Sequence, residues 1–208
     1  MYIAPADATL GTSEWRPFIE AHPFGHLVAA GRDRDVPVVV PTQFILEGDT
    51  VWLHLVRANP IFAALAEHPR VVLSVAADWA FIPSSWKAIG DEDPALGIPT
   101  TYYAAVQLIG TASVLDERDQ PGVVADVLRR QLGVFQPDIA VADPAEVHAP
   151  RLKTIVGISI AIDEVRAKFK YGGNVDDTHR RSVIDRLASR GGADDAAAAA
   201  HVARRLDA

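Results

Sequence analysis

Val51-Trp-Leu-His-Leu-Val-Arg-Ala-Asn-Pro60 is the stretch that indicates the fold most clearly, together with residues 61–68 and the run Pro69-Arg-Val-Val-Leu-Ser-Val75. Side chains alternate in character along residues 51–57, a period of two that is typical of a β-strand with two different faces. Residues 61–68 predict a helix, and the β-branched run after it predicts another strand. The stretch therefore predicts a strand, a helix and a strand joined by short connections.

The end of the first predicted strand has the features of an anion site. Arg57 and Asn59 lie there, and Pro60 is well placed in the first turn of the following helix, which Asn59 can cap with its side-chain oxygen. Free N–H groups and the helix dipole favour an anion, and an arginine can hold a phosphate or carboxylate with two parallel hydrogen bonds. A surface arginine beside an ordinary helix cap explains the same residues, so this stretch alone leaves both interpretations open.

The composition excludes several classes of protein. The 208 residues are 49% hydrophobic and carry a net charge of −7, which indicates a globular chain and opposes a nucleic-acid partner. Cysteine is absent, so disulfides, cysteine–zinc sites and thiol catalysis are excluded. No run approaches the roughly 20 apolar residues of a membrane span. The first residues also lack a charged segment followed by an apolar one, so we expect a cytoplasmic protein.

The rest of the chain reads as strands with helices inserted at intervals. Besides 51–57, strands are predicted at 26–30, 36–46, 70–77, 100–115 and 154–162, the last of them followed by residues 165–171, and helices at 13–22, 118–132, 176–189 and 194–206. About six strands that do not alternate with helices argue against a parallel doubly wound sheet, and the length of 100–115 suits a barrel. Residues 81–99 and 133–150 are predicted to be irregular, the former as a lid or a surface excursion.

We expect two parts in the chain. Residues 1–190 are predicted to form the main domain, and residues 191–208 an alanine-rich helical tail. The tail has few large apolar side chains, so it is expected to dock weakly, to serve an interface or to fray.

Several blocks of this sequence coincide with one family. They are Met1-Tyr-Ile3, His22-Pro-Phe-Gly25, His54-Leu-Val-Arg-Ala-Asn-Pro60, Pro83-Ser-Ser-Trp86, Ile98-Pro-Thr100 with Tyr103-Ala-Ala-Val106, and Lys168-Phe-Lys170. From residue 1 to about 187 the chain resembles the PaiB-like proteins, usually labelled FMN-binding negative transcriptional regulators. The resemblance implies a β-rich α+β fold: a split β-barrel like that of pyridoxamine-phosphate oxidases and flavin reductases, with peripheral helices. It also implies a homodimer with the cofactor at the subunit interface.

The resemblance assigns roles to some residues and shows departures at others. Arg57 and Asn59 match the end of the family's phosphate-binding strand, and Thr42 matches a threonine of the same pocket. The departures lie along segments expected to line the flavin ring: Gln43 and Lys87 replace a histidine and a tyrosine, Thr101-Tyr-Tyr103 replaces Trp-Asn-Tyr, His26 replaces a small or aliphatic residue, and the tail motif after Lys170 is altered to Tyr-Gly-Gly-Asn.

A branch that resembles these proteins in sequence, the piperazate synthases, binds haem and closes N5-hydroxyornithine into piperazic acid by making a nitrogen–nitrogen bond. Haem b needs an axial ligand, most often an imidazole, and cationic partners for its propionates. His54 and His26 are the candidate ligands, and only His26 discriminates, because His54 is also expected in flavin-binding relatives. Arg57 fits the anion of either cofactor, and Lys168 and Lys170 are candidates for a carboxylate.

The polar groups expected around the amino-acid substrate are Lys87, Ser84, Ser85, Thr101, Tyr102 and Tyr103. Ordinary loop polarity explains each of them as well. Two further functions stay open: a flavoprotein that binds FMN and acts as a reductase, oxidase or redox sensor, and a transcriptional regulator without catalysis. The acidic charge and the absence of a DNA-binding motif make the regulator the weakest of the three.

Overall fold

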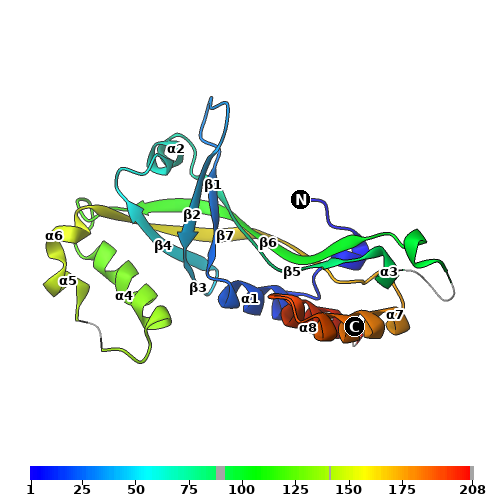
Figure 1. Ribbon diagram of the computed structural model, residues 1–208. Coiled ribbons are helices and arrows are strands. Elements are labelled where there is room, and N and C mark those ends of the chain that lie inside the picture. The colour runs from blue at the N-terminus through cyan, green and yellow to red at the C-terminus, as the bar shows by residue number, and fades with distance from the viewer. Residues whose placement is uncertain (88–91, 141, 207–208) are drawn as a thin grey trace. The chain divides into compact units, whose positions relative to one another are not determined.

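The computed structural model describes residues 1–87, 92–140 and 142–206 (Figure 1). The strands are β1 (Phe24–Ala29), β2 (Val38–Gln43), β3 (Ile45–Glu47), β4 (Thr50–Val56), β5 (Arg70–Ile82), β6 (Thr100–Leu115) and β7 (Ile155–Lys170). The helices are η1 (Pro5–Asp7), α1 (Thr12–Ala21), α2 (Ile61–Glu67), α3 (Ser84–Lys87), η2 (Pro94–Leu96), α4 (Val123–Phe135), α5 (Pro144–Val147), α6 (Ala149–Leu152), α7 (Asp177–Arg190) and α8 (Asp195–Arg204).

Within the described residues, seven strands form one sheet in the order β2-β1-β5-β6-β7-β4-β3. The pairs β1–β2, β1–β5, β3–β4 and β4–β7 are antiparallel. The two edge strands are consecutive in the chain, with only Phe44 between Gln43 and Ile45. The edges of the sheet therefore come together at Phe44, which is fully buried. A sheet that curls in this way without pairing its last two strands is a split β-barrel, as the sequence predicted.

The chain divides into two compact units. Unit 1 comprises residues 1–17, 76–106 and 167–208, and unit 2 comprises residues 18–75 and 107–166. The three longest strands, β5, β6 and β7, each contribute to both. The predicted boundary at residue 190 stays a prediction, and both α7 and α8 fall in unit 1.

Unit 2 contains the barrel and its core. Leu27, Leu53 and Leu73 point inward from neighbouring parts of the sheet and are fully buried, because alternate residues of a strand face opposite sides. On the outside of β4, helix α4 covers Trp52, whose ring lies 4.8 Å from the Arg130 guanidinium carbon. Helices α5 and α6 lie beside α4 (Figure 1). The inward-facing residues of these strands therefore form the core, whereas the outward-facing residues of β4 lie against helix α4.

Unit 1 is built around buried aromatic rings and helices α7 and α8, which lie side by side (Figure 1). Phe169 and Tyr171 are fully buried, and the Tyr171 ring stacks on His201 of α8 with the ring centroids 4.5 Å apart. Asp78 has a φ of +53°, in the left-handed region. At this residue the buried positions of β5 change from odd to even numbers, the effect of a β-bulge.

The structure corrects several element predictions. Strand β5 runs on to Ile82, α3 and η2 lie within 81–99, and α5 and α6 lie within 133–150, so these segments are less irregular than predicted. Residues 155–170 form one strand, which continues past the predicted end at residue 162. Its polar residues stay in the strand because they are exposed and paired: Arg70 binds Asp163 at 2.8 Å, and Arg166 binds Glu164 at 2.6 Å. The predictions for α2 and β6 are confirmed.

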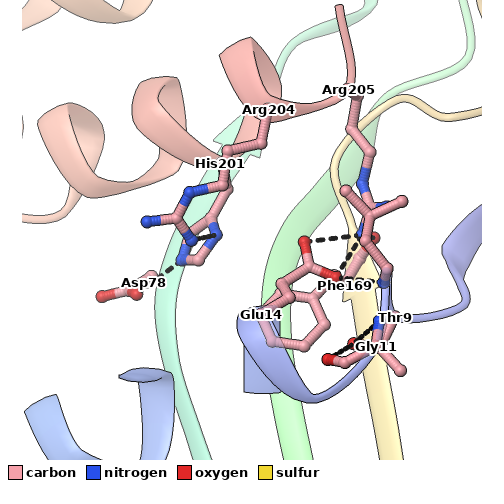
Figure 2. Close-up of polar contacts among 9 residues, drawn as sticks. Thr9, Gly11, Glu14, Asp78, Phe169, His201, Arg204 and Arg205 are labelled. Carbon is pink, nitrogen blue, oxygen red and sulfur yellow. Dashed lines mark hydrogen bonds and ion pairs between the residues drawn. The ribbon is translucent and has the colours of Figure 1, made fainter. Parts of the chain in front are cut away.

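The C-terminal helix also differs from its prediction, because it is firmly packed. Ala198 and Val202 are fully buried. Arg205 donates to the Glu14 carboxylate at 3.0 Å and 3.2 Å, and both side chains are almost completely buried (Figure 2). The tail was expected to dock weakly because it lacks large apolar side chains. Buried ion pairs anchor the helix in place of large apolar side chains.

Candidate functional site

The outward face of β1 carries His26, one of the two predicted metal ligands. Alternate residues of β1 point into the barrel and are buried, which leaves the His26 side chain exposed on the outside. Its cross-strand neighbours are Pro41 in β2 and Ser74 in β5. Phe24 and Val39 on the same face are 60% and 51% exposed. The imidazole therefore sits on an open, largely apolar sheet face.

His54, the other predicted ligand, is held beneath helix α4. It faces outward from β4, next to Trp52, and its Nδ1 lies 2.6 Å from Oε1 of the buried Gln131. An amide oxygen only accepts, so Nδ1 carries the proton and Nε2 keeps its lone pair. Metal-bound histidines show this arrangement, in which a second group fixes the tautomer. The same contact also satisfies a buried glutamine, which is sufficient reason for His54 to be there.

Arg57 lies just after β4 and is already paired. Its two terminal nitrogens donate to the two carboxylate oxygens of Asp116, and its Nε donates to the Lys153 carbonyl at 3.0 Å. Hydrogen bonding from Arg57 lowers the pKa of Asp116 from 3.8 to about 2. An anionic ligand would have to displace or share this carboxylate. Anion binding by Arg57 stays a prediction, and the structure adds a competitor to it.

The predicted helix cap beside Arg57 is confirmed. Asn59 Oδ1 accepts a hydrogen bond from the Ile61 backbone at 3.0 Å. A cavity of about 410 Å³ lies next to Arg57 and is lined also by Phe62 and Asp116. Thr42 does not line this cavity: it points into the barrel, is 6% exposed, and donates to the Gln43 carbonyl at 3.1 Å. Thr42 occupies a position of β2 that faces the barrel interior, which explains why it lies away from the cavity beside Arg57.

In unit 1, Lys87 lies at a second and larger cavity, which we call the Lys87 cavity. Its volume is about 620 Å³. It is lined by residues of α3, of the segment 92–98 and of the beginning of α7: Trp86, Lys87, Glu92, Leu96, Gly97, Ile98, Asn174, Val175, Asp176, Thr178, His179, Ser182 and Arg186. Burial and then the charge of Lys170 lower the pKa of Lys87. Of the residues predicted to surround a substrate, Lys87 is the one that this cavity includes.

The other predicted substrate residues are distributed differently. Tyr102 and Tyr103 are consecutive on β6 and so face opposite sides. Tyr102 is 2% exposed, its ring centroid lies 6.0 Å from that of Tyr171, and burial raises its pKa to about 12. Its predicted role beside a substrate stays a prediction, and the structure places the phenol in the packed interior of unit 1. Ser84 and Ser85 do not line the Lys87 cavity, although the Ser85 carbonyl accepts from Arg186 at 2.9 Å.

Thr101, Lys168 and Lys170 complete the predicted set in unit 1. Thr101 is half-buried on the same face of β6 as Tyr103. Lys168 is 9% exposed, and its ammonium lies 3.5 Å from Asp7 and 5.6 Å from the Tyr103 ring centroid. Lys170 Nζ donates to Thr100 Oγ1 at 2.6 Å. Each lysine therefore has a partner within the chain already.

Sequence reasoning missed Asp116, Gln131, His179 and Arg186. A signal existed for Gln131, because it interrupts the apolar stripe of α4 one turn after Val127, and a polar residue in such a position needs a buried partner. Asp116 follows a strand end, as many surface carboxylates do. His179 and Arg186 lie on the polar helix α7. Nothing local distinguishes these three residues.

Comparisons with known proteins agree with the fold. Residues 1–164 match the family described as "Putative FMN-binding domain". The protease synthase and sporulation protein PAI 2 of Bacillus subtilis (strain 168) is 24% identical over 191 residues, which cover 90% of this chain and 89% of that protein. In the part of the chain that the structure describes, no helix is long and apolar enough to cross a membrane.

Two solved structures share the architecture. The flavocytochrome Anf3 from Azotobacter vinelandii has a TM-score of 0.61 and 23% identity, over 83% of this chain and 74% of that one. The FAD and heme binding protein from Mycobacterium smegmatis has a TM-score of 0.57 and 18% identity, over 88% and 80% of the two chains. At such identities the likeness concerns the fold alone.

Proposed function

We propose a function that starts from the family: this chain belongs to the FMN-binding-domain family, as its PaiB-like blocks predicted. Within that family, we propose that it is a haem-binding enzyme. The reaction proposed is the closure of N5-hydroxyornithine to piperazic acid. A bond forms between the α-amine nitrogen and N5, the N5–oxygen bond breaks, and the oxygen leaves as water with protons from the substrate and solvent. No external oxidant or reductant is needed for this balance.

The observation that carries the haem proposal is the open position of His26. A flat porphyrin needs an apolar surface with one imidazole projecting from it, and the face around His26 offers both, with Phe24 and Val39 exposed beside it. His54 fits less well, because helix α4 packs on its face and Gln131 occupies its Nδ1. When bound, haem would supply a Lewis-acidic iron for cleavage of the nitrogen–oxygen bond. The structural relatives titled as a flavocytochrome and as a FAD and haem binding protein support this fold as a carrier of either cofactor.

The same face supports the proposal of a homodimer. Phe24 and Val39 are large apolar side chains on one side of the β1–β2 hairpin, and exposed apolar surface of this kind often marks an interface. A second copy would cover it and enclose the cofactor. Light scattering coupled to gel filtration measures the mass directly, and a mass of one chain would contradict the proposal.

The alternative function is that of an FMN-binding flavoprotein with reductase, oxidase or redox-sensing activity. The family description and the cavity beside Arg57 favour it. Its difficulty is Asp116, which already binds the guanidinium that would hold the phosphate. FMN binding at this place therefore requires Asp116 to turn away or to be protonated.

An absorption spectrum of the untagged protein separates the two cofactors. We expect a Soret band, and we expect His26→Ala to lose it while the matched control His148→Ala, which removes an exposed imidazole, keeps it. His54→Gln retains a hydrogen-bonding group beside Gln131 and tests the other ligand. A yellow protein with a flavin spectrum would support the alternative, and loss of the Soret band in His54→Gln alone would transfer the ligand role to His54.

Activity is tested separately. The haem-loaded protein is incubated with N5-hydroxyornithine, and we expect mass spectrometry to find a product lighter than the substrate by one water. A haem protein that leaves the substrate unchanged would contradict the proposed reaction while leaving the cofactor assignment intact.

A further inference from the structure

The Lys87 cavity lies wholly within unit 1 and is lined by basic groups, Lys87, His179 and Arg186, for which residues 1–87, 92–140 and 142–206 provide no ion pair. Among the described residues, Lys87 has no recorded hydrogen bond or ion pair. Burial and the charge of Lys170 both lower its pKa, and no carboxylate of the described residues is found to raise it. Lys170 itself is bound to a neutral hydroxyl, that of Thr100. The field at Lys87 is therefore positive.

His179 adds a second unsatisfied group to the same cavity. Its Nε2 is buried and, like Arg205 Nε, has no hydrogen-bond partner in the part of the chain that the structure describes. Its pKa is lowered by burial and then by the charge of Lys87. Arg186 lowers it further, and Asp176 is the carboxylate that opposes them. Buried polar atoms are nearly always paired in folded proteins, so an unpaired nitrogen on a residue that lines a cavity indicates a missing partner.

The two carboxylates in the cavity wall do not supply that partner. Asp176 Oδ1 accepts from the His179 backbone at 2.8 Å as the cap of helix α7, and Glu92 has an interaction of its own. Arg186 donates to the Ser85 carbonyl at 2.9 Å, and its guanidinium carbon lies 6.0 Å from the Trp86 ring centroid. The cavity thus combines positive charge with an apolar ring.

We propose that the Lys87 cavity binds a small organic acid, with its carboxylate between Lys87 and His179 and its apolar chain along Trp86 and Ile98. Charge-assisted hydrogen bonds from an ammonium and an imidazole are the strong means of holding a carboxylate. The exposed Ile98 and the face of Trp86 provide the apolar contact. This binding does not depend on the proposed haem reaction, although an amino-acid substrate would be one such acid.

Calorimetric titration of the full chain tests the proposal with hexanoate as the probe. We expect one hexanoate per chain and binding about 10-fold weaker for Lys87→Met, because one charge-assisted contact is lost; hexanol, which lacks the carboxylate and loses both contacts, should bind at least that much more weakly. The matched control is Arg181→Met, which removes an equal charge from an exposed position of α7, and we expect it to bind as the unmodified chain does. Equal binding of hexanol and hexanoate, or tight binding of inorganic phosphate alone, would overturn the proposal.

A proton NMR titration of His179 gives a second measurement that needs no variant at Lys87. We expect hexanoate, but not hexanol, to raise the pKa of His179, because a bound carboxylate stabilises the imidazolium. An unchanged His179 titration in saturating hexanoate would contradict the proposal even if hexanoate bound elsewhere. The result is independent of haem, so its failure leaves the proposed function untouched.

Discussion

The surroundings of helix α8 and the Lys87 cavity differ in how their buried charged groups are paired, although both belong to unit 1. Around α8, the buried Arg205 pairs with the carboxylate of Glu14, and His201 Nε2 donates to Asp78 at 2.9 Å (Figure 2). In the Lys87 cavity, basic groups face one another, and burial lowers the pKa of both Lys87 and His179. The paired charges around α8 stabilise the fold, whereas the basic groups of the Lys87 cavity are the ones to which we assign a ligand. The comparison therefore separates structural from binding residues.

The histidine in the α8 contact is hydrogen-bonded at both of its ring nitrogens. Arg204 Nη1 lies 3.3 Å from His201 Nδ1, and an arginine can only donate, so Nδ1 is the acceptor and Nε2 carries the proton toward Asp78. Figure 2 shows both contacts. Asp78 reaches this position because its backbone adopts a left-handed conformation. Local backbone strain in β5 is thus balanced by a buried hydrogen bond.

The largest effect is expected when the α8 contact is broken. Glu14→Gln leaves the shape of the side chain but removes its charge, so the Arg205 guanidinium stays buried without a counter-ion. We expect a loss of about 3–5 kcal/mol in the free energy of unfolding, measured with urea. The matched control is Asp177→Asn, which removes the exposed partner of Arg180 and should cost below about 1 kcal/mol. Equal losses in the two variants would remove the distinction between buried and exposed pairs.

A smaller effect is expected from the pair in unit 2, where Arg57 and Asp116 are partly exposed. The pKa of Asp116 falls from 3.8 to about 2, so its contribution to stability is complete above pH 3.8 and is lost as the pH falls toward 2. Asp116→Asn should flatten the acid limb of the stability curve in that window. The curve is measured by urea unfolding at a series of pH values. An unchanged slope would mean that Arg57 does not bind this carboxylate in solution.

The sequence predicted what depends on neighbouring residues. The alternation along residues 51–57 and 100–115 and the Asn59 cap were recognised because their causes lie within a few positions of one another. The PaiB-like blocks added the barrel, which no local pattern could give. The continuity of β7 was missed because polar residues in a strand look like an interruption until their cross-strand partners are known.

The site was predicted less well because its contacts join distant parts of the chain. Arg57 meets Asp116, His54 meets Gln131 and Glu14 meets Arg205, and none of these pairs is close in sequence. The same reason explains the tail, whose anchoring depends on partners near the N-terminus and in β5. Lys87 was singled out because it replaces an expected tyrosine. His179 could be recognised only when α7 was placed beside it.

The smallest expected effect concerns His179 and reverses the sign seen for Asp116. The pKa of His179 is lowered from 6.5, so the folded chain resists its protonation. Stability is therefore full above pH 6.5 and declines as the pH falls from 6.5 toward the lowered pKa. The groups that act on it are Lys87 and Arg186, which lower the pKa, and Asp176, which raises it, while Glu92 also lines the cavity.

His179→Gln should therefore remove a small destabilisation that develops as the pH falls below 6.5, measured by urea unfolding. Hexanoate should remove the same destabilisation in the unmodified chain, because its carboxylate supplies a counter-ion, as Glu14 does for Arg205. If hexanoate stabilised the His179→Gln variant as much as the unmodified chain, the acid would be acting away from His179. The unpaired groups of the Lys87 cavity would then no longer mark a binding site for the acid, and the contrast within unit 1 would concern stability alone.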